Sequence, residues 1–166
     1  LIKKYSVVIP VIQRDYAQGR KTEKPTKVRK DFVNNLILYL QAAEGEIHNL
    51  DFVYGTVVNG EFIPLDGQQR LTTLFLLHLY VACKSGKYNE FVNLMKSGER
   101  YRFEYKTRKS STMFCERLLT NQVIMPNVEK DKTDEDTFKI NDKSATLQEV
   151  IEDKGWFFYS WLNDPT

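Results

Sequence analysis

The chain has 166 residues, which suits one ordinary domain, and 42% of them are apolar, which excludes a disordered tail. Its 24 basic and 22 acidic residues leave a net charge of only +2, so it lacks the basic excess typical of nucleic-acid binders, although a local basic patch would still fit. No apolar run reaches the ~20 residues that span a membrane, and the two cysteines and two histidines make a zinc site improbable, so we expect a cytoplasmic protein with reduced thiols.

The first quarter of the chain predicts a strand, a loop and a helix. Residues 7–9 are β-branched and typical of a short buried strand. Residues 11–27 are polar and basic, which favours a loop. Apolar residues then recur with helical spacing over residues 28–43, and we expect Thr26 to cap this helix.

The middle of the chain predicts a β-hairpin followed by a long helix. Residues 50–58 and 61–65 are rich in β-branched and aromatic side chains, and Asn59-Gly60 between them favours a type I′ turn. Residues 66–83 have a helical pattern with apolar residues on nearly every side. We therefore expect this helix to be central and buried, with His78 as a core histidine.

The remaining pattern completes an α+β domain, a small mixed sheet with surrounding helices. We expect helices at 88–95 and 110–119, a strand with one wet face at 100–106, and a charged loop at 128–145. A final helix at 147–162 carries aromatic residues at helical spacing, which favours a packing face over a platform for stacking bases.

The segment Asp66-Gly67-Gln68-Gln69-Arg70 lies where the second hairpin strand passes into the long helix. The first amides of a helix have no partner within it, and together with the helix dipole they favour anions. Gly67 has no side chain, so a phosphate could approach the backbone closely. Arg70 opposes the dipole by about 0.3–1 kcal/mol, a cost that a bound phosphate would offset because it fits the guanidinium fork.

The residue types at this segment leave several roles open. Asp66 could hold a divalent metal beside the phosphates, or it could cap the helix while Gln69 closes a capping box. Gln68 or Gln69 could orient an attacking water, as glutamines do in some nucleotide hydrolases. The alternative is a well-capped helix in a protein–protein module, with Arg70 paired to a nearby carboxylate.

Two other segments carry candidate anion-binding residues. Gln13, Arg14 and Tyr16 follow the first strand, where Arg14 could grip a phosphate and Tyr16 could stack on a base. Arg108 lies among basic residues just before the helix at 110–119, which is another possible anion site. Both segments have a plain alternative, a solvated loop and an exposed strand end.

Three stretches spread over most of the chain carry a family resemblance: Ile9-Pro10 with Gln13-Arg14 and Tyr16; Phe62-Ile63-Pro64-Leu65-Asp66-Gly67-Gln68-Gln69-Arg70-Leu71-Thr72-Thr73-Leu74; and Trp156-Phe157-Phe158 with Trp161 and Asp164-Pro165. They look like the GmrSD-type N-terminal domain, the S-like half of modification-dependent restriction systems.

The resemblance implies a ParB/sulfiredoxin-like fold that binds and hydrolyses a nucleoside triphosphate with a divalent metal, Mg²⁺, in defence against phage or other foreign DNA. We expect this nucleotide-binding domain to cover residues 1–125 and a mobile segment with the start of a helical extension to cover residues 126–166. The residues expected to be catalytic are Asp66, with the metal, and Gln68, Gln69 and Arg70; those expected to bind nucleotide are Gln13, Arg14, Tyr16, Gly67, Thr72 and Arg108.

The resemblance also bears on DNA. A nuclease domain of His-Asn-His type is expected outside this chain, which has no such motif, so we expect a part of a longer protein that meets modified DNA only as a whole. The basic residues at 21–30 and 100–109 allow a second function, a non-catalytic DNA-binding module of a ParB-like kind. Asp66 distinguishes the two functions, because a carboxylate suits a site for a metal and nucleotide, whereas it would repel the phosphate backbone of DNA.

Overall fold

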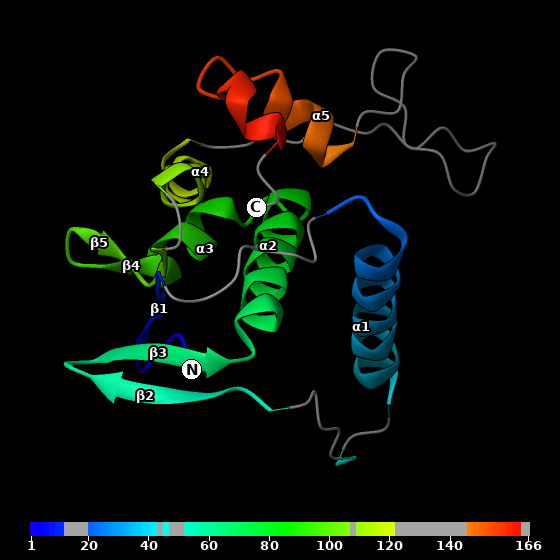
Figure 1. Cartoon of the computed structure of the whole chain (residues 1–166), viewed down its shortest axis with the longest axis vertical. Helices are drawn as coiled ribbons and strands as arrows, with labels where there is room; N and C mark the ends of the chain where they lie inside the picture. Colours follow the sequence, from blue (N-terminus) through cyan, green and yellow to red (C-terminus); the bar gives the residue numbers. More distant parts are fainter. Residues whose placement is uncertain (12–19, 43–44, 47–51, 107–108, 122–145, 164–166) are drawn as a thin grey trace.

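The computed structural model describes residues 1–11, 20–42, 45–46, 52–106, 109–121 and 146–163, and it confirms the α+β class. The larger sheet has the strand order β2-β3-β1-β6, and a two-stranded ribbon lies beside it. The strands are β1 (Ser6–Ile9), β2 (Tyr54–Val58), β3 (Glu61–Asp66), β4 (Lys96–Ser97), β5 (Arg100–Tyr101) and β6 (Phe103–Tyr105). Figure 1 shows the helices α2 to α5 on one side of the β2–β3 hairpin and α1 standing apart.

The helices are α1 (Glu23–Gln41), α2 (Gln68–Lys84), α3 (Tyr88–Met95), α4 (Lys109–Thr120) and α5 (Leu147–Glu152), followed by a short 3₁₀ helix, η2 (Tyr159–Asn163). In the described part of the chain, no helix combines the length and the apolar character that crossing a bilayer would require.

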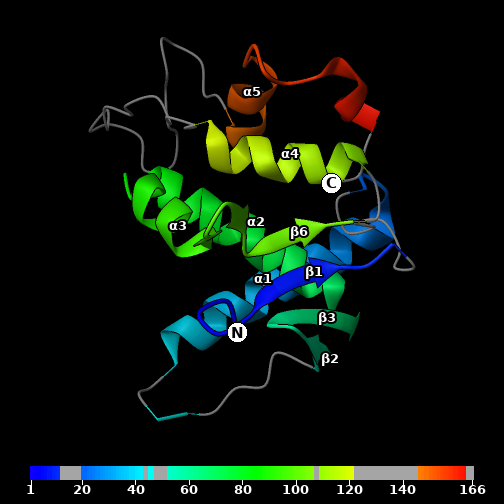
Figure 2. The ribbon, with the colours of Figure 1, turned by 90° about the vertical axis from the view of Figure 1, so that its left-hand side faces the viewer.

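Strand β1 lies in the middle of the sheet and pairs in parallel on both sides, with β3 through Val7↔Phe62 and with β6 through Ile9↔Tyr105. The β2–β3 hairpin is antiparallel, and both residues of its turn have positive φ, 50° at Asn59 and 80° at Gly60. The predicted type I′ turn is thereby confirmed. Parallel pairing brings the carboxyl ends of β1, β3 and β6 to one edge of the sheet, as the arrowheads in Figure 2 show.

One hydrophobic core joins the sheet to the helices. Val7 and Ile9 of β1 meet Phe75 and Leu79 of α2 in it. The other helices contribute buried apolar side chains to the same core: Tyr88, Phe91, Val92 and Met95 from α3, Cys115, Leu118 and Leu119 from α4, and Val150 and Ile151 from α5. The described residues after the expected boundary at 125 therefore pack on the same core as those before it.

The long helix α2 forms as predicted, but the expectation that it is buried on all sides is wrong. Its buried residues include Thr72, Phe75 and Leu79, while Val81 is 54% exposed. His78 is exposed rather than buried in the core, and its Nδ1 lies 2.6 Å from the carbonyl oxygen of Leu74, one turn earlier. The apolar surface of α2 exceeds what its neighbours cover.

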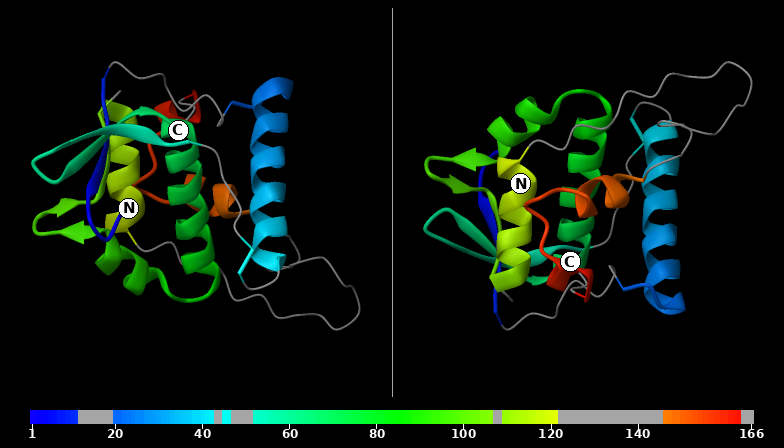
Figure 3. Two further views of the ribbon diagram at one scale, coloured as in Figure 1. Left: turned by 90° about the horizontal axis from the view of Figure 1, so that it is seen from below. Right: turned by 90° about the horizontal axis from the view of Figure 1, so that it is seen from above.

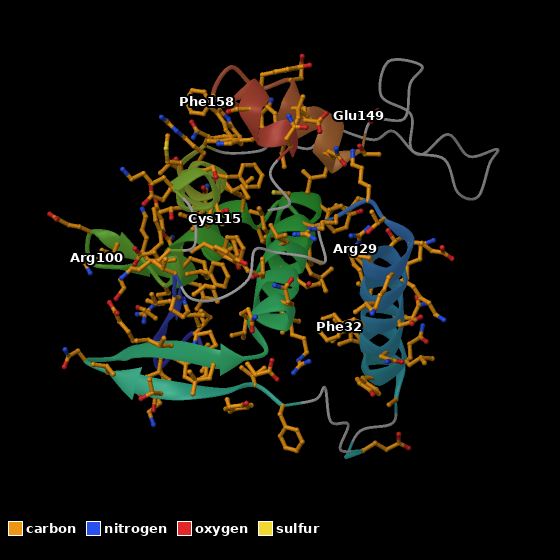
Figure 4. All side chains as sticks on the ribbon, viewed as in Figure 1. Arg29, Phe32, Arg100, Cys115, Glu149 and Phe158 are labelled. Atoms are coloured by element: carbon orange, nitrogen blue, oxygen red, sulfur yellow. The ribbon has the colours of Figure 1, made fainter. Side chains whose placement is uncertain are left out.

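Helix α1 begins at Glu23, five residues before the expected start, and its N-cap is Thr22 rather than Thr26. The sequence pattern places the start of this helix too late because Pro25 is typical of a loop. Proline is nevertheless tolerated in the first turn of a helix, where Pro25 lies. None of its 19 residues is buried. Figure 3 shows α1 lying alongside α2, and in Figure 4 Phe32 projects from α1 toward it.

Other boundaries also differ from the predicted ones. The strand expected at 100–106 is interrupted at Arg102, and the last helix breaks after Glu152 before η2. The aromatic packing face is confirmed: the Trp161 ring meets Phe114 and Phe157 edge-on at centroid distances of 5.4 Å and 5.6 Å. The loop expected at 128–145 lies outside the described residues.

The phenol of Tyr88 anchors α3 to α4 inside the core. Its hydroxyl donates a hydrogen bond of 2.8 Å to the carbonyl oxygen of Leu118. Burial, and then the nearby Cys83 thiol, raise the pKa of Tyr88 to about 12. The phenol therefore stays neutral and keeps its proton for this hydrogen bond.

Phe75 tests how much the core depends on contact between α2 and the sheet. Its ring stacks on Phe103 of β6 at a centroid distance of 4.5 Å. We expect Phe75→Ala to lower the free energy of unfolding by about 3–5 kcal/mol, because it leaves a cavity, measured by denaturant titration. Val81→Ala, on the exposed side of the same helix, should change it by less than about 0.5 kcal/mol; equal losses would contradict this account of the core.

Candidate functional site

The chain changes direction between β3 and α2 at Gly67. Asp66 still pairs with Tyr54 as the last residue of β3, and Gly67 then adopts φ 86°, ψ 5° in the left-handed region. The first hydrogen bond of this helix start runs from the Leu71 amide to the Gly67 carbonyl oxygen, at 3.0 Å. The first amides of a helix generally lack a carbonyl one turn earlier to pair with, and the positive end of the helix dipole lies there.

Asp66 does not occupy the N-cap position, so the alternative in which it caps the helix and Gln69 closes a capping box is not the arrangement found. Gly67 holds the N-cap position, and no side chain caps α2. The Asp66 side chain is 57% exposed, and its carboxylate lies 3.7 Å from a guanidinium nitrogen of Arg70. At this distance and exposure the ion pair adds little to stability.

Arg70 is held beside the helix start by the protein itself. Its side chain is 22% exposed, and its guanidinium donates a hydrogen bond to the carbonyl oxygen of Phe52. Phe52 belongs to the segment just before β2, and sequence reasoning did not connect it with the motif. No local pattern could have done so, because the contact depends on how the hairpin folds back on α2.

Gly67 meets the same segment. A Cβ on Gly67 would lie 2.7 Å from Cγ2 of Val53 and 3.0 Å from its Cα. The positive φ and this contact explain why glycine stands at the position. Val53 therefore fills the space on one side of Gly67 that was expected to admit a phosphate. A phosphate could approach the Gly67 backbone only from the other side, where the amides of the helix start lie.

Gln68 is the buried polar residue of the motif. It is 8% exposed, and its side-chain Oε1 has no hydrogen-bond partner among the described residues. An unsatisfied buried polar atom costs about 1–3 kcal/mol. The oxygen and nitrogen of an amide can exchange places by a flip, so this side chain could present either a donor or an acceptor to a ligand.

In the next turn of α2, two threonine hydroxyls donate hydrogen bonds to backbone carbonyl oxygens of the same helix. Thr72 is fully buried, and its hydroxyl donates to the carbonyl oxygen of Gln68 at 2.9 Å. The hydroxyl of Thr73 donates to Gln69 in the same way, also at 2.9 Å. Thr72 therefore lies in the core beneath the helix start, and its predicted role in nucleotide binding stays a prediction.

The other predicted site residues, Gln13, Arg14, Tyr16 and Arg108, lie outside the described residues. The described ends of their segments are close together, because the Lys106 amide donates to the Ile9 carbonyl oxygen at 2.8 Å. The chain thus leaves β1 and β6 from one place, at the edge where β3 runs into α2.

One comparison with known proteins gave a match. The family model described as "GmrSD restriction endonuclease, N-terminal domain" matches residues 1–164. Neither the curated proteins nor the solved structures gave a match, so the ParB/sulfiredoxin-like character of the fold stays a prediction.

Gly67 can be tested against a matched glycine. We expect Gly67→Ala to destabilise the fold by about 1–3 kcal/mol, from backbone strain and from contact with Val53. Gly86 also has positive φ, 70°, but a Cβ there meets nothing within 4 Å. Gly86→Ala should cost only the strain, and Val53→Ala should recover part of the Gly67→Ala loss. Equal losses at the two glycines in thermal unfolding would refute the contact.

Proposed function

The chain belongs to the GmrSD restriction endonuclease N-terminal domain family, and from this premise we propose that it binds and hydrolyses a nucleoside triphosphate within its restriction protein. The phosphates would lie at the start of α2, between Gly67 and Arg70. In this reading nucleotide turnover serves a modification-dependent restriction system directed against phage or other foreign DNA.

The observation that carries the proposal is the parallel pairing of β1 with both β3 and β6. Ligands of open α/β sheets commonly bind beyond the carboxyl ends of parallel strands, where neighbouring connections part. Here the motif follows β3, the segment with Gln13, Arg14 and Tyr16 follows β1, and the segment with Arg108 follows β6. The three segments singled out from the sequence leave the sheet at one edge.

The residues at the helix start divide the work by their chemistry. The first amides of α2 and the Arg70 guanidinium are donors suited to phosphate oxygens. To donate both of its terminal nitrogens to a phosphate, the Arg70 guanidinium would have to give up its ion pair with Asp66 and its hydrogen bond to the Phe52 carbonyl oxygen. Gln68, buried with an unsatisfied amide oxygen, is the group we assign to a water or to the nucleotide, and Gln69, half-buried beside it, is the other candidate for orienting the water.

The metal expected with the nucleotide fits this site only as an ion that is bound jointly by the protein and the triphosphate. Among the described residues, no group of three or more His, Cys, Asp or Glu side chains could hold a metal ion. Mg²⁺ usually binds through one or two carboxylates together with substrate phosphates and water. Asp66 supplies one exposed carboxylate, which fits an ion that arrives with the triphosphate. Such an ion would neutralise charge on the phosphate oxygens during transfer.

The structure offers less to the alternative, a non-catalytic DNA-binding module. Of the basic residues at 100–109, Arg100 lies 3.9 Å from Glu61 and Lys106 lies 3.7 Å from Glu104, and the Nε of Arg102 donates to the Lys96 carbonyl oxygen at 3.0 Å. The two ion pairs offset part of the positive charge of Arg100 and Lys106, and the hydrogen bond ties the Arg102 guanidinium to its own ribbon. Modified DNA, and a C-terminal nuclease that cuts it, are partners we propose for the full-length protein.

The proposal is tested by nucleotide binding to the full-length protein. With Mg²⁺ and ATP, GTP, CTP or UTP, we expect at least one nucleotide to bind in calorimetry and to release phosphate. Arg70→Ala should weaken binding about 10–100-fold, the value of one or two charge-assisted hydrogen bonds. Asp66→Asn should reduce the dependence of binding on Mg²⁺ and slow phosphate release.

Arg100→Ala is the matched control, because Arg100 is a basic residue of the same domain whose side chain is 79% exposed. It should leave nucleotide affinity unchanged, and the variants must unfold at the wild-type temperature for the comparison to hold. Absence of binding and of turnover with all four nucleotides would rule the function out.

A further inference from the structure

Strand β2 is an open edge of the larger sheet. It is the first strand in the order β2-β3-β1-β6, and all five of its residues are exposed. No described element lies beyond it in Figures 1 and 2. At the opposite edge, α4 is joined to β6 by a hydrogen bond from the Thr112 hydroxyl to the Tyr105 carbonyl oxygen.

This edge lacks the devices that usually keep an exposed strand from pairing. Lysine, proline or an inward-pointing charge commonly protects such edges. The sequence of β2 is Tyr-Gly-Thr-Val-Val, with neither charge nor proline. Its one irregularity lies at the end, between Tyr54 and Gly55, and leaves the rest of the strand regular. Its exposed row of backbone donors and acceptors is therefore a template for another strand.

The residues of β2 are complementary to the same residues running in the opposite direction. A two-fold axis at Thr56 would place Thr56 opposite its own copy, Gly55 opposite Val57, and Tyr54 opposite Val58. Threonine pairs and aromatic–β-branched pairs are favourable across antiparallel strands. A two-fold interface brings each residue near its own copy, where a charge would repel itself. A strand without charges avoids that repulsion and offers a charged peptide nothing to recognise.

Exposed apolar side chains lie along this edge on both faces of the strand. Tyr54, Val57 and Val58 are all about half exposed on β2, and Phe52, just before the strand, is 81% exposed. Pairing with a second strand would cover part of this apolar area.

We propose that β2 is a homodimerisation edge, where two copies of this chain pair their β2 strands antiparallel about Thr56 into one continuous sheet. The pairing is centred on Thr56, whereas the candidate nucleotide site meets only the beginning of this segment, where Tyr54 pairs with Asp66. The partner is a second copy, since pairing about Thr56 sets Thr opposite Thr and Tyr opposite Val and brings no like charges together.

The test is a charge swap at Thr56 in the 166-residue chain, followed by sedimentation equilibrium over a range of concentrations. We expect the wild-type chain to show a concentration-dependent species of twice the monomer mass. Thr56→Lys alone and Thr56→Glu alone should lose it, because two like charges would face each other. An equimolar mixture of the two variants should regain it as a heterodimer.

Val81→Lys is the control, since it places the same charge on an exposed apolar position of α2 and should leave the dimer intact. Near-UV circular dichroism of each variant should match the wild-type spectrum, because Thr56 is exposed. A wild-type chain that stays monomeric, or a Lys and Glu mixture that fails to associate, would overturn the proposal. Pairing of β2 only with another part of the restriction protein would overturn it as well, in favour of that occupant.

Discussion

The candidate site depends on the parallel pairing of a single central strand with two neighbours that lie far from it in sequence. β1 joins β3 through Val7↔Phe62 and β6 through Ile9↔Tyr105, and Val7 and Ile9 are both buried in the core. A shift of register by one residue would turn these side chains to the wrong face. The same pairing that fixes the core therefore fixes which three connections emerge together at the carboxyl edge, and the chemistry proposed for that edge follows from it.

The helix start has residues with clear structural roles beside residues that the fold explains less well. Gly67 is required by its left-handed conformation and by Val53, which are structural reasons. Asp66 and Arg70 are placed by that turn, but their mutual contact at 3.7 Å is loose and partly exposed, so it explains little of their presence by stability alone. The buried Oε1 of Gln68 has no hydrogen-bond partner among the described residues, so its burial lowers the stability of the fold. Residues that break local rules without compensation are typical of functional sites.

Local patterns predicted the elements well where neighbouring residues alone decide them. The Asn59-Gly60 turn, α3 and the wet and dry faces around Phe103 and Tyr105 all follow from short-range preferences. The failures come from tertiary structure. A stretch of apolar residues on α2 could not show that His78 and Val81 would remain exposed, and no periodicity could show that the Phe52 carbonyl would accept a hydrogen bond from Arg70. The motif marked the candidate site, but no sequence pattern indicated that the segment before β2 would cover one side of it.

Helix α1 has a consequence for the dynamics of the domain. Because none of its residues is buried, its detachment would expose little additional apolar surface, and α1 lacks the tertiary packing from which most helices in proteins take their stability. Its opening therefore costs far less than global unfolding, and its amide hydrogens should exchange with solvent long before those of β1. The core and α1 are thus expected to differ in local stability by as much as they differ in burial.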